Sequence, residues 1–223
     1  LAEDIKPNRL ERAKLVVESL LDNLQGESVG LVVFAGTAFL QSPMSPDYQI
    51  LRGFLKDLNP DFIPQGGTNY DAMLETALDS FRQSDSQADR FLIVISDGES
   101  LDNSWSQHIE ALEAQNARAI CLGFGTTEGG LIPDGQGGYH KDSAGAVVLT
   151  QLEAETLKSL ASQTGGVFRE ANVWVDLAAL IEETVKRGAT GETGSLSQSI
   201  HIERYQIFLA PGLLLILISL YRE

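Results

Sequence analysis

The stretch Phe91-Leu-Ile-Val-Ile-Ser96-Asp97-Gly98-Glu99 decides which fold this chain is expected to adopt. Its first five residues are all apolar, which is typical of a strand buried on both faces of a parallel sheet. In open α/β sheets, ligands bind beyond the carboxyl ends of the strands. Because Asp97 follows this apolar run, we expect its carboxylate at the ligand-binding edge of such a sheet.

Helical and strand patterns alternate on both sides of this stretch. Apolar residues at helical spacing predict helices over residues 7–24, 47–58, 70–82, 105–116, 151–164 and 174–187. Apolar runs predict strands over residues 29–35, 90–95, 118–124 and 167–169, with residues 37–41 as an antiparallel partner of the first. This alternation predicts an α/β fold: a Rossmann-like open sheet, mostly parallel with one antiparallel edge strand, with helices on both faces.

Length and charge narrow the possible functions. The 223 residues suit one large α/β domain with a short additional segment. A net charge of −15 argues against nucleic acid as a partner, because nucleic-acid binding needs basic patches that displace counterions. The single cysteine, Cys121, lies in an apolar run, so we expect a buried thiol rather than a reactive one.

A second segment, Gln65-Gly-Gly-Thr68-Asn-Tyr-Asp71, places a hydroxyl at the start of a predicted helix. A hydroxyl and a carboxylate that converge at one sheet edge are suitable ligands for a small hard cation such as Mg²⁺. We therefore take Thr68 and Asp97 as candidate metal ligands. Each also has a purely structural interpretation: Thr68 with Asp71 fits a variant of the capping box, and Asp97-Gly98 is a common turn sequence.

Residues 125–149 interrupt the alternating pattern with a polar, glycine-rich excursion. Within it, residues 139–141 and 146–149 are expected to form a hairpin. The excursion follows a predicted strand whose carboxyl end points to the same edge as Asp97. It is therefore either a wall that shapes access to the site or a surface loop without a role.

The C-terminal part of the chain has a different composition. Residues 189–204 are rich in glycine, serine, threonine and glutamate, which predicts a linker after a domain over residues 1–188. An uncharged apolar run then predicts a transmembrane segment over residues 205–223, with a buried core helix as the alternative. Arg222 favours a cytoplasmic end for that segment and a domain on the outer side.

Together these segments resemble the von Willebrand factor A domain. Gly-Gly-Thr68 before a helix, and an apolar strand ending in Ser96-Asp97-Gly98-Glu99, match the second and third loops of that family's metal-ion-dependent adhesion site. Residues 1–14 are similar to the segment after the first loop in bacterial membrane-anchored members of the aerotolerance BatA/BatB type. The resemblance implies Thr68 and Asp97 as metal ligands, Mg²⁺ as the divalent cation, and the bacterial inner membrane as the location, with the domain on the periplasmic side.

The Asp-x-Ser-x-Ser pattern of the family's first loop does not occur in these 223 residues. If the family pattern holds, the chain is truncated just after that loop, lacks the first strand of the fold, and carries an incomplete metal site. We then expect the strands at residues 29–35 and 90–95 to lack their shared partner. We also expect weak binding of Mg²⁺, which calorimetric titration would contradict by showing sub-millimolar affinity.

The resemblance implies a binding module, not an enzyme, that recognises a protein partner offering a carboxylate. The implied setting is envelope integrity or stress tolerance, alongside a MoxR-type ATPase and sister proteins of the same family. The alternative is a Mg²⁺-dependent phosphoryl-transfer hydrolase that uses Asp97. The sequence offers it no Walker-type loop, and its three histidines, His108, His140 and His201, are scattered. Nucleotide binding at Gly123-Phe-Gly125 is a weak third option, because no helix pattern follows directly.

Overall fold

The computed structural model describes residues 2–63, 66–84, 88–100, 103–134, 137–141, 145–172 and 174–191. Residues Leu1–Gly188 form one compact unit, and only the first three residues of a second unit, Ala189–Glu223, are among those described. These three continue the last helix, where the linker was expected to begin. The rest of the predicted linker and the transmembrane segment predicted over 205–223 lie outside the described residues. Within the described part of the chain, no helix is both long and apolar enough to cross a membrane.

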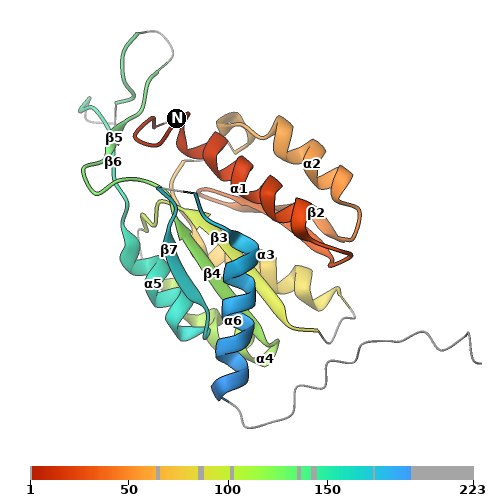
Figure 1. The fold of residues 1–223 in the computed structure, drawn as a ribbon. Helices are drawn as coiled ribbons and strands as arrows, with labels where there is room; N and C mark the ends of the chain where they lie inside the picture. Colours follow the sequence, from red (N-terminus) through yellow and green to blue (C-terminus); the bar gives the residue numbers. More distant parts are fainter. Residues whose placement is uncertain are drawn as a thin grey trace, which may run out of the picture. The chain divides into compact units, whose positions relative to one another are not determined.

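Helices and strands alternate as the sequence predicts, which confirms the α/β class (Figure 1). In chain order the elements are α1 (Arg9–Asn23), β1 (Val29–Phe34), β2 (Ala38–Ser45), α2 (Tyr48–Asp57), η1 (Pro60–Phe62), α3 (Tyr70–Arg82), β3 (Arg90–Ser96), η2 (Ser104–His108), α4 (Ile109–Ala114), β4 (Ala117–Gly123), β5 (Gly130–Leu131), β6 (Leu149–Thr150), α5 (Ala154–Gln163), β7 (Val167–Glu170) and α6 (Leu177–Gly191).

Three parallel strands form the larger hydrogen-bonded sheet, in the order β3-β4-β7. β3 and β4 stay in register from the pair Arg90 and Ala117 to the pair Ser96 and Gly123. β7 joins the other side of β4 and ends with Glu170 opposite Gly123. Because parallel strands finish at the same edge, these last pairs mark the carboxyl edge at which a ligand site is expected.

β1 and β2 pair antiparallel, as predicted, but among the described strands they form a sheet of their own and are not hydrogen-bonded to the edge of the parallel sheet. Their register runs from Phe34 opposite Ala38 to Val29 opposite Ser45. Among the described strands, β1 pairs only with β2 and β3 pairs only with β4. The prediction that these two strands lack a shared partner is therefore confirmed. The described strands form three hydrogen-bonded groups, β1-β2, β3-β4-β7 and the short pair β5-β6, instead of one continuous sheet.

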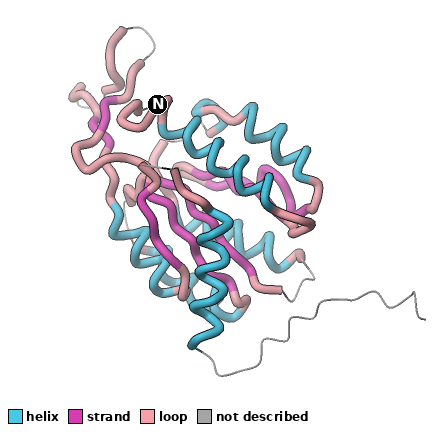
Figure 2. The backbone as a smooth tube through the Cα atoms, viewed as in Figure 1, coloured by secondary structure: helices cyan, strands magenta, loops and turns pink. Residues whose placement is uncertain are grey.

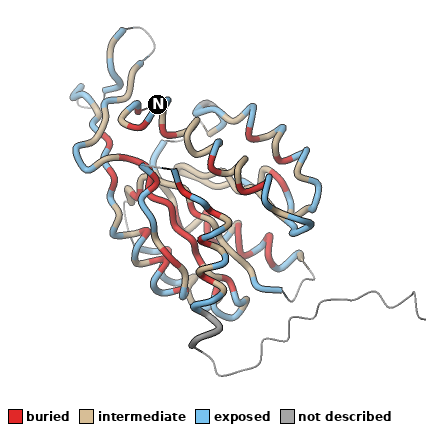
Figure 3. The backbone as a smooth tube through the Cα atoms, in the orientation of Figure 1, coloured by how far each residue is buried: buried red, intermediate tan, exposed pale blue. Residues whose placement is uncertain are grey.

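Side chains of β4 alternate between two buried clusters, and this alternation places helices on both faces of the sheet (Figure 2). Ala119 and Cys121 pack with residues of α3, α4 and α5. Ile120 and Leu122 point to the opposite cluster, which α1 and α6 cover. Fully burying one such aliphatic side chain contributes about 2 kcal/mol. Figure 3 shows the contrast along the backbone, with β4 buried and β1 only partly so.

Local signals explain where several helices begin. Asn8 caps α1 and Asp47 caps α2, each by accepting a hydrogen bond from a backbone N–H in the first turn. The single helix predicted over residues 105–116 divides into the 3₁₀ turns of η2 and the short helix α4. Tight 3₁₀ turns are frequent at helix N-termini, and sequence periodicity does not separate them from an α-helix.

The excursion contains most of the predicted hairpin, and it also contains a strand pair that was not predicted. Lys141 does bridge to Val147, as that hairpin requires. Leu149, however, lies in β6 and pairs with Leu131 of β5, which was not assigned as a strand. β5 and β6 thus close the base of the excursion, at one side of the unit in Figure 1.

Candidate metal-binding site

Asp97 lies where the sequence predicts, directly after β3 at the carboxyl edge of the parallel strands. Its backbone carbonyl accepts a hydrogen bond from the N–H of Glu153, at 2.8 Å, just before α5. Gly98 follows with φ +84°, and a Cβ atom there would collide with the carbonyl group of Glu153. The turn therefore needs glycine. It uses the backbone of Asp97, so it does not compete with a ligand role for the carboxylate.

Thr68 lies just before α3, but it is not the cap of that helix. Asn69 is the cap, and its side-chain oxygen accepts a hydrogen bond from the N–H of Ala72. The carboxylate of Asp71 is engaged elsewhere, 2.9 Å from Nε2 of His108. The capping-box interpretation of Thr68 with Asp71 is therefore wrong, because the helix uses the next residue along.

The segments that carry Thr68 and Asp97 meet through their neighbours. The hydroxyl of Tyr70 donates a hydrogen bond to Oγ of Ser96 at 2.8 Å. Tyr70 follows Thr68 by two residues, and Ser96 directly precedes Asp97. This bond ties the start of α3 to the end of β3. That Thr68 and Asp97 share one cation stays a prediction.

Arg9 dominates the surroundings of the Asp97 carboxylate. Its Nη1 donates to Oδ2 of Asp97 at 3.2 Å and to Oγ1 of Thr150 at 2.9 Å. Its Nε and Nη2 each donate to the Asp4 carboxylate at 2.9 Å, in a bidentate pair. The side chains of Arg9 and Asp4 are only 10% and 6% exposed, and that of Asp97 is 28% exposed. Such bidentate, charge-assisted contacts are strong and fix the geometry of both groups.

Thr150 links this cluster to a second acid. Its hydroxyl lies 2.8 Å from Oε1 of Glu99 and 3.2 Å from Oδ2 of Asp97. A hydroxyl carries one proton, so it donates to the nearer Glu99 while accepting from Arg9. Asp97 and Glu99 are thereby held beside each other by one hydroxyl and one guanidinium.

Burial and charge move the pKa values of two acids in opposite directions. Burial raises the pKa of Asp97, and the neighbouring Glu99 raises it further, against the opposing effects of Arg9 and Thr150. Burial also opposes ionisation of Asp4, but hydrogen bonds from Arg9 and Thr126 and the charge of Arg9 outweigh it and leave the pKa of Asp4 lowered. Asp4 is thus the main ion-pair partner of Arg9, and its ionised form is favoured in the fold. The ionised form of Asp97 is disfavoured, because the contact with Arg9 does not fully offset burial and the charge of Glu99.

The residues around Asp97 supply part of the ligand set that a divalent cation needs. Three carboxylates and one guanidinium leave two formal negative charges when all are ionised, and the atoms nearest Asp97 that can bind a metal are oxygens, as Mg²⁺ prefers. In the described part of the chain, no group of three or more His, Cys, Asp or Glu side chains is placed to hold a metal ion by itself. Asp97 would hold the cation, with the Thr68 hydroxyl as a second ligand, and further ligands are needed.

Sequence reasoning missed most of the groups around Asp97. Asp4, Arg9 and Thr150 were not singled out, and Glu99 was quoted without a role. They lie in three segments that are distant in the sequence, and no local spacing relates them. One signal was available: Asp4 and Arg9 carry opposite charges five residues apart, next to the apolar Ile5.

Comparison with known proteins identifies the family. A model of the von Willebrand factor type A domain matches residues 1–99. The crystal structure of conserved hypothetical protein BatB from Bacteroides thetaiotaomicron is 32% identical over 85% of this chain and 93% of that one, with a TM-score of 0.73. An aerotolerance-related membrane protein from Bacteroides fragilis is 30% identical over 83% of this chain and 92% of that one, with a TM-score of 0.74. The chain therefore belongs to the von Willebrand factor type A domain family. Within that family it is of the BatB type, as the sequence predicts.

A more distant structure shares the fold. Proximal thread matrix protein 1 from the mussel byssus, with a zinc-occupied metal-ion-dependent adhesion site, is 19% identical over 84% of this chain and 43% of that one, with a TM-score of 0.54. A search of curated protein sequences found no match.

Proposed function

We propose that this chain is the binding domain of a membrane-anchored protein and that it recognises another protein through a divalent cation held by Thr68 and Asp97. The observation that carries the proposal is the Asp97 carboxylate, partly exposed at the carboxyl edge of the sheet beside Glu99. Domains of this family are generally protein-interaction modules, and the sequence offers no nucleophile and base in one motif, so we do not propose an enzyme.

Two observations support the cation. The mussel protein of the same fold binds zinc at its adhesion site. Here the cluster of oxygen atoms and its surplus of negative charge favour a hard ion, and we propose Mg²⁺. When bound, the ion supplies a positive centre that can accept a carboxylate from the partner. Such a contact is strong where water is excluded.

We also propose the biological setting. One relative is an aerotolerance-related membrane protein, which supports a membrane location and a role in stress tolerance; envelope integrity is a further part of the proposal. We propose the bacterial inner membrane as the location, with residues 1–188 on the periplasmic side, and sister proteins of the family and a MoxR-type ATPase as partners. The apolar segment predicted over 205–223 would be the anchor.

The test is capture of a co-expressed MoxR-type ATPase and sister protein by the full-length protein and its variants. Thr68→Ala and Asp97→Ala should each abolish capture, and EDTA should do the same until Mg²⁺ is restored. Matched controls are Thr76→Ala and Asp79→Ala, both on α3, whose side chains bond within their own helix. Capture that survives both site substitutions and EDTA would overturn the proposal. Loss of phosphatase or nucleotide turnover in the same variants would instead favour the hydrolase.

A further inference from the structure

We propose that Arg9 is the positioning residue of this site: it fixes the Asp97 carboxylate and, together with its partner Asp4, fastens the two ends of the excursion, at Gly125-Thr126 and at Thr150, beside it. The base of the excursion is then part of the framework of the site. The positioning role of Arg9 is argued from contacts within the chain. Only the consequence that this positioning aids cation binding rests on the proposed function.

A single guanidinium connects three separate parts of the chain. It holds Asp4 in the segment before α1, Asp97 at the end of β3, and Thr150 at the end of β6. Thr150 is held twice, because its backbone carbonyl also accepts from Nη2 of Arg9 at 3.1 Å. Only arginine offers enough donors in a fixed planar fork to make these contacts together; a lysine ammonium is one point of charge.

The beginning of the excursion reaches the same cluster through Asp4. Oδ2 of Asp4 accepts from the N–H of Thr126 at 2.8 Å and from its hydroxyl at 3.2 Å. Gly125, directly before it, packs on the guanidinium, since a Cβ there would lie 2.9 Å from Cζ of Arg9. The first residues of the excursion are therefore shaped to fit around Arg9.

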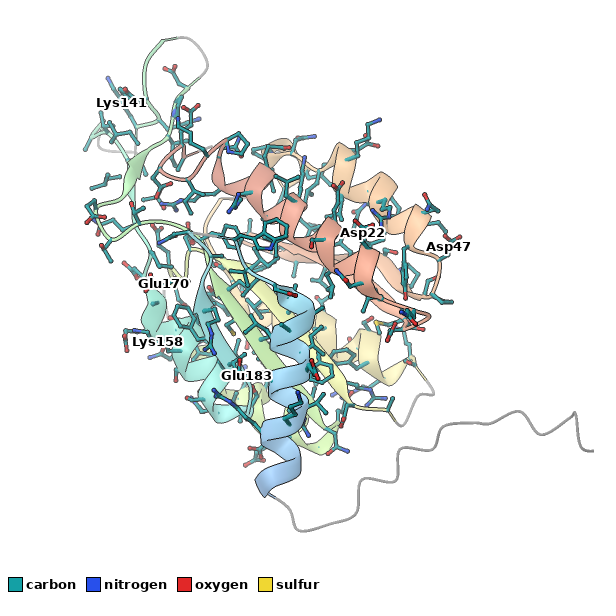
Figure 4. All side chains as sticks on the ribbon, viewed as in Figure 1. Asp22, Asp47, Lys141, Lys158, Glu170 and Glu183 are labelled. Atoms are coloured by element: carbon teal, nitrogen blue, oxygen red, sulfur yellow. The ribbon has the colours of Figure 1, made fainter. Side chains whose placement is uncertain are left out.

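The end of the excursion is fastened by the second acid of the site. Oε1 of Glu99 accepts from the Thr150 hydroxyl at 2.8 Å and from the N–H of Gln151 at 3.2 Å. Both ends thus depend on charged groups that surround Asp97. Figure 4 shows the side chains of the described residues and labels Lys141 on the excursion.

Hydrogen exchange measured by mass spectrometry on the whole chain, without added metal, tests the inference. In Arg9→Lys, segments 124–134 and 145–152 should exchange at least about tenfold faster, because the lysine keeps the charge but loses the fork. Segment 117–123 in β4 should be unchanged. The matched control is Arg90→Lys at the opposite end of β3, where Arg90 bonds to the carbonyls of Gln115 and Ser84; it should leave both excursion segments unchanged.

A milder variant keeps the test decisive if Arg9→Lys does not fold. Thr150→Val preserves volume and removes the hydroxyl shared by Arg9, Asp97 and Glu99. It should speed exchange in the same segments by about threefold, whereas Thr76→Val should not. Unchanged exchange in the excursion would overturn the inference. A uniform rise over all segments would also overturn it, because it would show a merely structural arginine.

Repeating the measurement with excess Mg²⁺ separates this inference from the proposed function. Faster exchange of the excursion in Arg9→Lys supports the positioning role whether or not Mg²⁺ has any effect. Protection of residues 97–99 by Mg²⁺ in the unsubstituted chain, lost in Asp97→Ala, supports the cation site. Either result can therefore fail while the other stands.

Discussion

β4, its neighbour β3 and the separate strand β1 have similarly apolar sequences but very different surroundings. β4 is hydrogen-bonded on both sides, and nearly all of its residues are buried. Among the strands that the structure describes, β1 and β3 each have one partner, and all residues of β1 and most of β3 are only half-buried. Composition alone therefore does not decide burial, because a strand needs neighbours on both edges as well as helices on both faces.

The same comparison shows where this domain is vulnerable. Unpaired strand edges are templates for pairing with other chains. Apolar edges such as those of β1 and β3 increase that risk. The measurements below compare the paired strand with the two open ones, from the largest expected effect to the smallest.

The largest contrast is expected between two glycines. A Cβ at Gly166 would collide with the backbone of Ala119 in β4, so Gly166→Ala should cost more than about 4 kcal/mol or prevent folding. A Cβ at Gly30 in β1 would lie 3.0 Å from the Met44 sulfur, which can move, and 3.2 Å from the Ser42 carbonyl, which needs only a small shift, so Gly30→Ala should cost about 1–2 kcal/mol. Urea unfolding of both variants measures the difference. Equal losses would mean that β1 is packed as tightly as β4.

Leucine truncation should give the next largest contrast. Leu122 in β4 is fully buried, so Leu122→Ala should lower the free energy of unfolding by about 3–4 kcal/mol. Leu31 in β1 is half-buried, so Leu31→Ala should cost about half as much. Thermal and urea unfolding of the pair test this, and a larger loss at Leu31 would break the comparison.

Acid should weaken the charged contacts that join the N-terminal segment to the end of β3. Because the pKa of Asp4 is lowered in the fold, its ionised form stabilises the protein above the unfolded pKa and this stabilisation disappears as the pH falls through the folded one. Asp4→Asn should therefore cost about 3 kcal/mol at pH 7, because it leaves Arg9 buried without its main partner.

The difference between Asp4→Asn and the unsubstituted chain should begin to shrink as the pH falls below the unfolded pKa of about 4, and it should disappear as the pH falls through the lowered pKa of Asp4 in the fold. Urea unfolding at a series of pH values gives this profile. A difference that does not depend on pH would show that the charge of Asp4 contributes nothing.

The smallest effect concerns single amides along the strands. In β3, alternate N–H groups point toward β4 and the others toward the open edge. We expect the outward set to exchange about tenfold faster or more than the inward set, while all amides within β4 are slow. Residue-resolved exchange by NMR measures this. Uniform protection along β3 would mean that its outer edge is covered in solution.

Most of the fold could be predicted from the sequence, because its elements carry local signals. The apolar run before Asp97 and the helical spacing around Met73 and Leu78 both correspond to observed elements. The split at His108 and the pairing of Leu149 with Leu131 were not predicted, since both depend on packing outside the segment.

The site was predictable only in part. The glycine after Asp97 and the polar group at a strand end indicated the edge, and the predicted residue is there. The contribution of Arg9 and Thr150 to the site could not be predicted, because these residues meet only when the end of the excursion packs against the start of α1. Contacts between residues far apart in the chain produce no periodic pattern in the sequence from which they could be predicted.

The thiol of Cys121 gives the molecule a chemical reporter of its own interior. It lies fully buried in β4, and burial raises its pKa to about 12, while the thiolate is the form that alkylating reagents attack. Labelling of this group should therefore require the sheet to come apart around it. Since the chain has no second cysteine, the rate of alkylation reports how often β4 becomes exposed, and no engineered probe is needed.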